Sequence, residues 1–286
     1  MPVSQGGNTG TVAVIGATGQ QGGAVARHLL ARGAAVRALV RDPGSERAVR
    51  VRNQGASVVR ADLADPASLV SALRGADTLF AMTTFAEDGP AGEVRQGRAI
   101  GDAAREAGVS HVVYSSVGGA DRATGIPHFE SKWAIEEHLR EAGLNLTVIR
   151  PVFFMDNLRG AARPEPGGDE RVFRFPLAPG VPLQMISVED IGAIGATAVL
   201  LPDSIPGGQL EIAADQLTPE QIAEAFSERT GQKTRFEAVD IAGITDDDQR
   251  AMFEWFTQVP AYRGDFTRTS ALRQSPLRFA DYLRTL

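Results

Sequence analysis

Near its N-terminus the chain reads VAVIGATGQQGG over residues 12–23. Four apolar residues, a glycine-containing turn and the start of an amphipathic stretch follow one another, which is the order of a strand, a turn and a helix. The glycines keep the spacing Gly16-x-x-Gly19-x-x-Gly22. The first permits a tight turn off the strand, the second a close approach of the backbone to a pyrophosphate, and the third close packing of helix against sheet. This stretch therefore predicts a nucleotide-binding strand, turn and helix at the start of the fold.

The backbone N–H groups at the start of such a helix point toward a bound anion. We expect the pyrophosphate of a dinucleotide to contact the turn and the first residues of the helix, which are Gly16, Thr18, Gly19, Gln20, Gln21 and Gly22. A tight turn that binds no ligand is the alternative interpretation. The chain contains no G-x-x-x-x-G-K-[ST] sequence, so the NTPase loop of that type is not predicted.

Apolar runs and amphipathic stretches alternate from Thr11 to about Arg150. The apolar runs predict strands at Thr11–Ile15, Ala35–Arg41, Ser57–Arg60, Thr78–Met82, His111–Ser116 and Leu144–Arg150. The stretches between them predict helices at Gln20–Arg32, Ser45–Gln54, Pro66–Arg74, Pro90–Ala107 and Pro127–Ala142. Strands this rich in Val, Ile and Leu are typical of a sheet that is buried on both faces. We therefore predict an α/β fold with a doubly wound, parallel Rossmann sheet over residues 11–151.

After Pro151 the alternation stops, and Pro- and Gly-rich segments indicate loops. Further elements are predicted at Val188–Leu200 (helix), Gln209–Ala213 (strand), Thr218–Thr230 (helix) and Thr234–Val239 (strand), with helices to the end. We expect residues 152–286 to form a smaller C-terminal α+β domain that closes a substrate pocket, with some segments returning to the Rossmann sheet. Residues 1–10 are predicted to be a flexible leader.

The composition excludes several classes of protein. With 43% hydrophobic and 22% charged residues, the chain has an ordinary globular composition. A net charge of −6 does not favour generic nucleic-acid binding. The absence of cysteine excludes disulfides, thiolate metal sites and cysteine nucleophiles. The four histidines form no H-E-x-x-H pattern, so no metal site is predicted.

No segment is predicted to cross a membrane. The best apolar run, Ile191–Leu201, has 11 residues, whereas a spanning helix needs about 20. The first ten residues have neither the basic nor the apolar region of a signal peptide. We therefore expect a cytoplasmic protein.

Basic residues are distributed unevenly. From Arg27 to Arg60 there are eight arginines and two acids, Asp42 and Glu46. Arg41 ends the second predicted strand, where an NAD-specific site places a carboxylate, and an arginine there suits a 2′-phosphate. NADP(H) is therefore predicted in preference to NAD(H), although Asp42 is also suited to NAD. Asp62 and Leu63 follow the third strand and are expected to contact adenine, and Thr83 follows the fourth and is expected beside the cofactor's central part.

Several segments together resemble the NmrA-like branch of the atypical short-chain dehydrogenase/reductase superfamily. They are V-x-G-A-T-G-x-x-G at Val14–Gly22, R-A-L-V-R at Arg37–Arg41, V-Y-S-S-V at Val113–Val117, H-F-E-S-K at His128–Lys132, R-P-V-F-F-M-D-N-L at Arg150–Leu158 and S-V-E-D-I-G at Ser187–Gly192. The resemblance covers nearly the whole chain, more loosely at its C-terminal end. The family includes reductases of quinones and other unsaturated compounds, and NADP(H)-responsive regulators with little or no turnover.

The usual catalytic signature of that superfamily is Tyr-x-x-x-Lys with an upstream serine, and this chain departs from it. Four residues before Lys132 stands His128, on the same face of a predicted helix. The resemblance implies that Lys132 contacts the nicotinamide ribose or moves a proton, that His128 occupies the place of the proton donor, and that Ser116 binds a substrate oxygen. Ser115 and Pro151 are expected beside the cofactor. The alternatives are a helix-start histidine and strand-end serines without chemistry.

Lysine is itself rare in this chain, because only Lys132 and Lys233 occur among 29 basic residues. Lysine can lose its proton in a protein, whereas arginine cannot. An apolar wall over the nicotinamide is predicted from Phe85, Phe153 and Phe154, with Asn157 in the same substrate pocket. Packing between the two domains is the alternative for the aromatic residues.

Two functional hypotheses follow. The first is an NADPH-dependent oxidoreductase that reduces a small apolar acceptor, such as a quinone, an enone or another unsaturated or aromatic carbonyl compound. The second is a non-catalytic NADP(H) redox sensor and regulator that acts through a regulatory protein partner. A nucleic-acid partner and membrane association are not expected, and a monomer and a homodimer both remain open.

Overall fold

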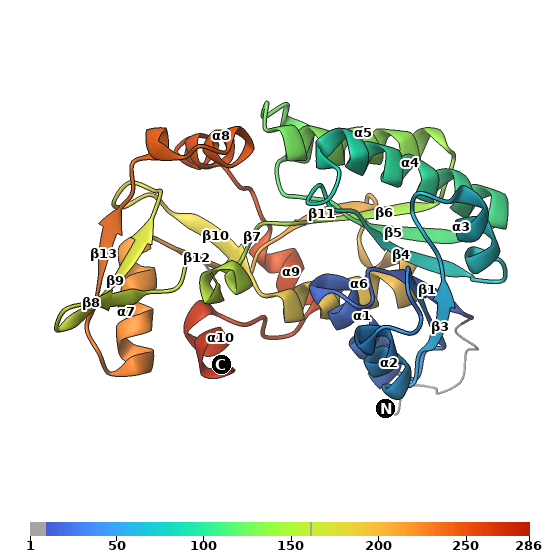
Figure 1. The fold of residues 1–286 in the computed structure, drawn as a ribbon, viewed down its shortest axis with the longest axis horizontal. Helices are drawn as coiled ribbons and strands as arrows, with labels where there is room; N and C mark the ends of the chain where they lie inside the picture. The colour runs from blue at the N-terminus through green and yellow to red at the C-terminus, as the bar shows by residue number, and fades with distance from the viewer. Residues whose placement is uncertain (1–9, 161) are drawn as a thin grey trace.

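The computed structural model describes residues 10–160 and 162–286, so the predicted leader lies outside the described residues except for Gly10. In this part of the chain, seven parallel strands form one sheet in the order β11-β6-β5-β4-β1-β2-β3 (Figure 1). The strands are β1 (Val12–Ile15), β2 (Val36–Val40), β3 (Ser57–Arg60), β4 (Thr78–Met82), β5 (His111–Ser115), β6 (Leu146–Pro151) and β11 (Gln209–Ile212). The predicted α/β class with a parallel Rossmann sheet is confirmed.

Helices cover both faces of this sheet (Figure 1). One face carries α1 (Gln20–Ala31), α2 (Glu46–Asn53) and α6 (Val188–Leu200), and the other carries α3 (Pro66–Leu73), α4 (Gly89–Ala107) and α5 (Pro127–Glu141). A Cβ on Gly192 of α6 would lie 2.4 Å from the Cβ of Ala24 on α1. The glycine therefore permits a close approach that fixes α1, and with it the glycine turn, against the sheet.

The strand at Gln209–Ile212 follows the break in the alternation, yet it belongs to the large sheet. It pairs in parallel with β6, with Leu210 beside Ile149. The helix α6 likewise packs on the large sheet, next to α1. Two segments from the second half of the chain thus complete the nucleotide-binding layer.

The rest of the chain forms a smaller part beside this layer (Figure 1). Two small sheets have the orders β12-β10-β7 and β13-β9-β8. Their strands are β7 (Phe153–Phe154), β8 (Glu165–Gly167), β9 (Glu170–Phe175), β10 (Leu183–Ile186), β12 (Asp215–Leu217) and β13 (Thr234–Ala238). The helices of this part are α7 (Pro219–Thr230), α8 (Asp247–Phe256) and α10 (Phe279–Arg284), with the 3₁₀ turns η2 (Met155–Arg159) and η4 (Ile241–Gly243). Helix α9 (Phe266–Leu272) packs against β11 and α6, and the 3₁₀ turns η1 (Ala120–Arg122) and η3 (Pro202–Ser204) follow β5 and α6 of the large layer.

Two buried carboxylates attach the C-terminal segment to the body of the molecule. Asp190 of α6 accepts hydrogen bonds from Arg273 Nε at 3.0 Å and from the backbone N–H of Leu277 at 2.8 Å. Asp215 of β12 accepts from the backbone N–H of Phe279 at 2.8 Å. Because α6 lies on the large sheet and β12 in a small one, the end of the chain bridges the two parts.

Candidate cofactor-binding and active site

The glycine turn has the geometry that the sequence predicts. Gly16 adopts a φ of +75°, and the N–H of Gly19 donates to its carbonyl at 2.8 Å. Helix α1 then begins at Gln20, with Gly19 as its N-cap and no side chain capping it. A Cβ on Gly22 would stand 2.4 Å from the carbonyl group of Gly16. The N-terminal N–H groups of α1 are therefore available to an anion, and Gly22 holds the helix directly against the turn.

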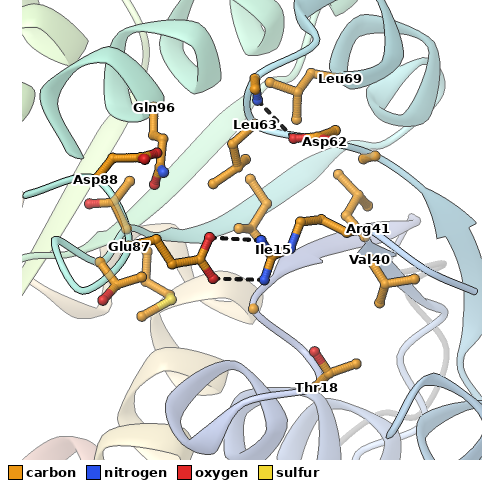
Figure 2. Close-up of a pocket in the computed structure, with 17 residues that line it drawn as sticks. Ile15, Thr18, Val40, Arg41, Asp62, Leu63, Leu69, Glu87, Asp88 and Gln96 are labelled. Carbon is orange, nitrogen blue, oxygen red and sulfur yellow. Dashed lines mark hydrogen bonds and ion pairs between the residues drawn. The ribbon is translucent and has the colours of Figure 1, made fainter. Parts of the chain in front are cut away.

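A pocket of about 420 Å³ opens beside this turn, at the carboxyl ends of β1, β2, β3 and β4 (Figure 2). Six of the predicted cofactor residues line it: Gly16, Thr18, Arg41, Asp62, Leu63 and Thr83. Its wall also contains Met82, Thr84, Glu87, Asp88 and Gln96 from β4, α4 and the loop between them. In an open α/β sheet, ligands bind at this edge. The pocket is thus the candidate site for the adenosine half of a dinucleotide.

Arg41 forms a two-pronged ion pair across this pocket. Its Nη1 and Nη2 donate to the two carboxylate oxygens of Glu87 at 2.7 and 2.8 Å (Figure 2). The hydrogen bond and charge of Glu87 raise the pKa of Arg41 above its ordinary value. Glu87 lies in the loop between β4 and α4, and sequence reasoning did not identify it.

Lys132 lies at the centre of a buried polar cluster. Its Nζ donates to the carbonyl of Thr83 at 2.7 Å and to the Thr83 hydroxyl at 3.1 Å, and it lies 2.8 Å from Glu93 Oε1. The other Glu93 oxygen accepts from Ser131 Oγ, and Tyr114 Oη lies 3.0 Å from Thr83 Oγ1. The cluster thus fixes Thr83, which follows β4 and lines the pocket.

Burial shifts the pKa values of Lys132 and Tyr114, which contact Glu93 or Thr83. It lowers the pKa of Lys132 below its usual value, although the Glu93 carboxylate opposes this shift. It raises the pKa of Tyr114 well above the usual value, against the hydrogen bond to Thr83. Tyr114 is fully buried and does not line the pocket, so it does not replace the absent tyrosine of the usual signature.

His128 is held by a residue from the smaller part of the molecule. Asp248 of α8 accepts from the backbone N–H of His128 at 2.9 Å, and its other oxygen lies 2.5 Å from the ring Nδ1. The ring of Phe85 stacks on the imidazole with centroids 4.8 Å apart. Burial lowers the pKa of His128, and the Asp248 carboxylate opposes that shift. This pairing leaves Nε2 as the ring atom that is free to take up or release a proton.

The two serines at the end of β5 differ in their contacts. Ser115 donates to the Gln21 side chain at 2.8 Å, which connects β5 to the first turn of α1. Ser116 is only 6% exposed, and within residues 10–160 and 162–286 its hydroxyl has no hydrogen-bond partner. Buried hydroxyls without a partner are costly, so a ligand atom at Ser116 would be favourable. Pro151 ends β6, and its carbonyl accepts from Gly118.

The four predicted substrate residues lie in different surroundings. Phe85 is 38% exposed, beside His128. Phe153 is buried, and its ring packs on Phe175 and Phe256 in the aromatic core of the smaller part. Phe154 is half-buried, and Asn157 is exposed in η2. None of the four lines the 420 Å³ pocket among the residues that the structure describes.

Metal and membrane features are not found in the described residues. They contain no group of three or more His, Asp or Glu side chains arranged to hold a metal ion. None of their helices combines the length and apolarity that crossing a membrane would require.

Known proteins resemble this chain in sequence and fold. It is 34% identical over 260 residues to the NmrA-like family domain-containing oxidoreductase malD of Malbranchea aurantiaca, covering 79% of this chain and 74% of that one. It is 31% identical over 230 residues to the NAD(P)H azoreductase of Xenophilus azovorans, covering 80% and 77%.

Among solved structures, the negative transcriptional regulator Nmra in complex with NAD has a TM-score of 0.85 at 21% identity, covering 98% of this chain and 96% of that one. The same regulator in complex with NADP has a TM-score of 0.84. These likenesses support the fold. The sequence matches the NmrA-like family over residues 8–277, and the chain therefore belongs to that family.

Proposed function

We propose that this protein is an NADP(H)-dependent oxidoreductase that reduces a small apolar acceptor, such as a quinone, an enone or another unsaturated or aromatic carbonyl compound. The observation that carries the proposal is the continuity of the site. The glycine turn, the pocket with Arg41 and the cluster around Lys132 all meet at the carboxyl edge of one sheet, joined through Thr83. Relatives described as an oxidoreductase and as an NAD(P)H azoreductase support the proposal.

The residues present fit a dinucleotide. There is no room for a side chain at Gly16 or Gly22, and the start of α1 offers free N–H groups to a pyrophosphate. The planar guanidinium of Arg41 can donate two hydrogen bonds to a 2′-phosphate. The reduced nicotinamide, when bound, supplies a hydride. We assign Thr83 and Lys132 to holding the cofactor's central part, Ser116 to a substrate oxygen, and Nε2 of His128 to delivery of a proton. The charge of Asp248 favours the protonated imidazole and so opposes the lowering of the His128 pKa by burial. A cytoplasmic location stays a prediction from the sequence.

The test is consumption of NADPH by the purified protein with a panel of quinones, enones and aromatic aldehydes. We expect turnover with one class of acceptor and a loss of about 100-fold in Lys132→Met, because a small misplacement of the bound cofactor can reduce the rate by that much. The matched control is Lys233→Met, because Lys233 is 80% exposed and we expect it to keep full turnover.

Lys132→Met leaves the carboxylate of Glu93 buried without its positively charged partner, which costs about 3–5 kcal/mol. The double variant Lys132→Met/Glu93→Gln removes both charges and shows whether lost turnover reflects chemistry or unfolding. A folded double variant with wild-type turnover would remove Lys132 from the mechanism.

A second candidate function is an NADP(H) sensor that acts on a protein partner. One observation favours it: all three N–H donors of Lys132 are used by Thr83 and Glu93, so none is left for a ligand without rearrangement. Sensing requires two conformations with different cofactor affinity. A protein that binds NADPH but consumes none with any acceptor would support this function, and partner capture that is identical with and without NADPH would contradict it.

A further inference from the structure

We propose that Glu87 competes with the ribose 2′-phosphate for Arg41, and that this competition sets the choice between NADPH and NADH. The inference rests on the proposed cofactor site and adds a specificity-determining residue to it. Arg41 stands at the end of β2, and Glu87 reaches it from the loop between β4 and α4, on the other side of the pocket (Figure 2).

The geometry shows which donors are engaged. Nη1 and Nη2 of Arg41 each meet one oxygen of Glu87, at 2.7 and 2.8 Å. A planar guanidinium binds a carboxylate and a phosphate through the same two-pronged arrangement. The carboxylate of Glu87 therefore occupies the donors that a 2′-phosphate would use. Both side chains are open to a ligand, with 67% of Arg41 and 54% of Glu87 exposed.

The two forms of the cofactor meet this pair differently. A 2′-phosphate brings negative charge to Arg41 and repels the Glu87 carboxylate, so NADPH must displace Glu87. The 2′-hydroxyl of NADH carries no charge and donates a hydrogen bond that a carboxylate accepts. Glu87 therefore weakens NADPH binding and leaves NADH binding unaffected or stronger.

The experiment measures Kd for NADPH and for NADH separately, from the fluorescence of the reduced nicotinamide, in the wild type and in Glu87→Gln. We expect Glu87→Gln to tighten NADPH binding by about 3- to 10-fold, somewhat beyond the effect of an exposed ion pair because phosphate repulsion is also relieved. NADH binding is expected to stay the same or to weaken. The matched control is Glu46→Gln, because Glu46 is 95% exposed on α2 and lines no part of the pocket.

A second pair of variants tests whether Glu87 acts through Arg41. Arg41→Gln should weaken NADPH binding, and in that background Glu87→Gln should tighten it by less than in the wild type, because the competition for Arg41 is gone and only the repulsion between Glu87 and the phosphate remains. Equal changes for both cofactors, no change for either, or full persistence of the effect without Arg41 would overturn the inference. A wild-type protein that binds neither cofactor would overturn the proposed function itself, whereas binding with an unchanged NADPH-to-NADH ratio in Glu87→Gln defeats only the role of Glu87.

Discussion

Lys132 and His128 lie four residues apart on α5, yet different parts of the chain hold their side chains. Lys132 is fixed by Thr83 after β4 and by Glu93 of α4, within the nucleotide-binding layer. His128 is fixed by Asp248 of α8, in the smaller part. The first turns of α5 therefore contact both parts of the molecule at the proposed reaction site.

The contact between Asp248 and His128 predicts a pH effect. Burial lowers the pKa of His128 and the carboxylate raises it, so Asp248→Asn should lower the pKa of the imidazole further. An NMR titration of the ring, together with the pH profile of kcat/KM, measures the shift, and the limb due to His128 should move to lower pH. Asp247→Asn is the control, since Asp247 is 84% exposed in the same helix. A shift to higher pH would contradict the role given to Asp248.

At the scale of single elements, the sequence predicted what depends on local pattern. The glycine spacing at Gly16–Gly22 and the apolar runs located the turn and the first six strands, because each is specified by neighbouring residues. The strand at Gln209–Ile212 was also predicted, but its place beside β6 depends on a contact about 60 residues away and not on any local signal. The two- and three-residue strands β7, β8 and β12 are too short for periodicity to detect.

The charged residues of the site were missed for a related reason. Glu93 lies in an amphipathic helix, Glu87 in a loop and Asp248 near a helix start, where exposed carboxylates are common. Glu93 is buried where α4 meets α5, Glu87 pairs with Arg41 at the end of β2, and Asp248 pairs with His128 where α8 meets α5. In sequence, the small residues Gly92 and Gly97 lie near Glu93, and both are buried in α4; they are a local signal that could have indicated a buried position for Glu93.

The contact between α1 and α6 predicts a stability effect at the scale of helix packing. A side chain on Gly192 meets Cβ and backbone atoms of Ala24 at 2.4–3.1 Å, and the backbone of α1 cannot move aside without shifting the glycine turn. Gly192→Val should therefore lower the free energy of unfolding by about 1–3 kcal/mol, measured by urea denaturation. Gly243→Val is the control, because no atom lies within 4 Å of its Cβ position. Equal losses in both variants would refute this account of the packing.

At the scale of the whole molecule, the C-terminal segment connects the nucleotide-binding layer to the smaller part. Asp190 is fully buried and bonds to Ser187, Arg273 and Leu277. Because removal of one partner leaves the others unsatisfied, Asp190→Ala should lower the free energy of unfolding by about 3–5 kcal/mol. Limited proteolysis should then cut first within residues 265–286. As a control, Asp281→Ala removes an exposed ion pair with Arg284 and should cost at most about 1 kcal/mol. A similar loss of stability in Asp190→Ala and Asp281→Ala would contradict the role of Asp190 in connecting the C-terminal segment to the nucleotide-binding layer.

The loop of residues 83–88 has three attachments along its length. The carbonyl of Thr83 binds Lys132, the ring of Phe85 stacks on His128, and the carboxylate of Glu87 pairs with Arg41. A ligand that takes Arg41 from Glu87 releases one attachment and leaves the other two at the reaction site. The 2′-phosphate is present in both NADPH and NADP⁺ and absent from both forms of NAD. Any signal transmitted through this loop would therefore depend on whether the bound dinucleotide carries the 2′-phosphate. It would not depend on whether the nicotinamide of that dinucleotide is oxidised or reduced.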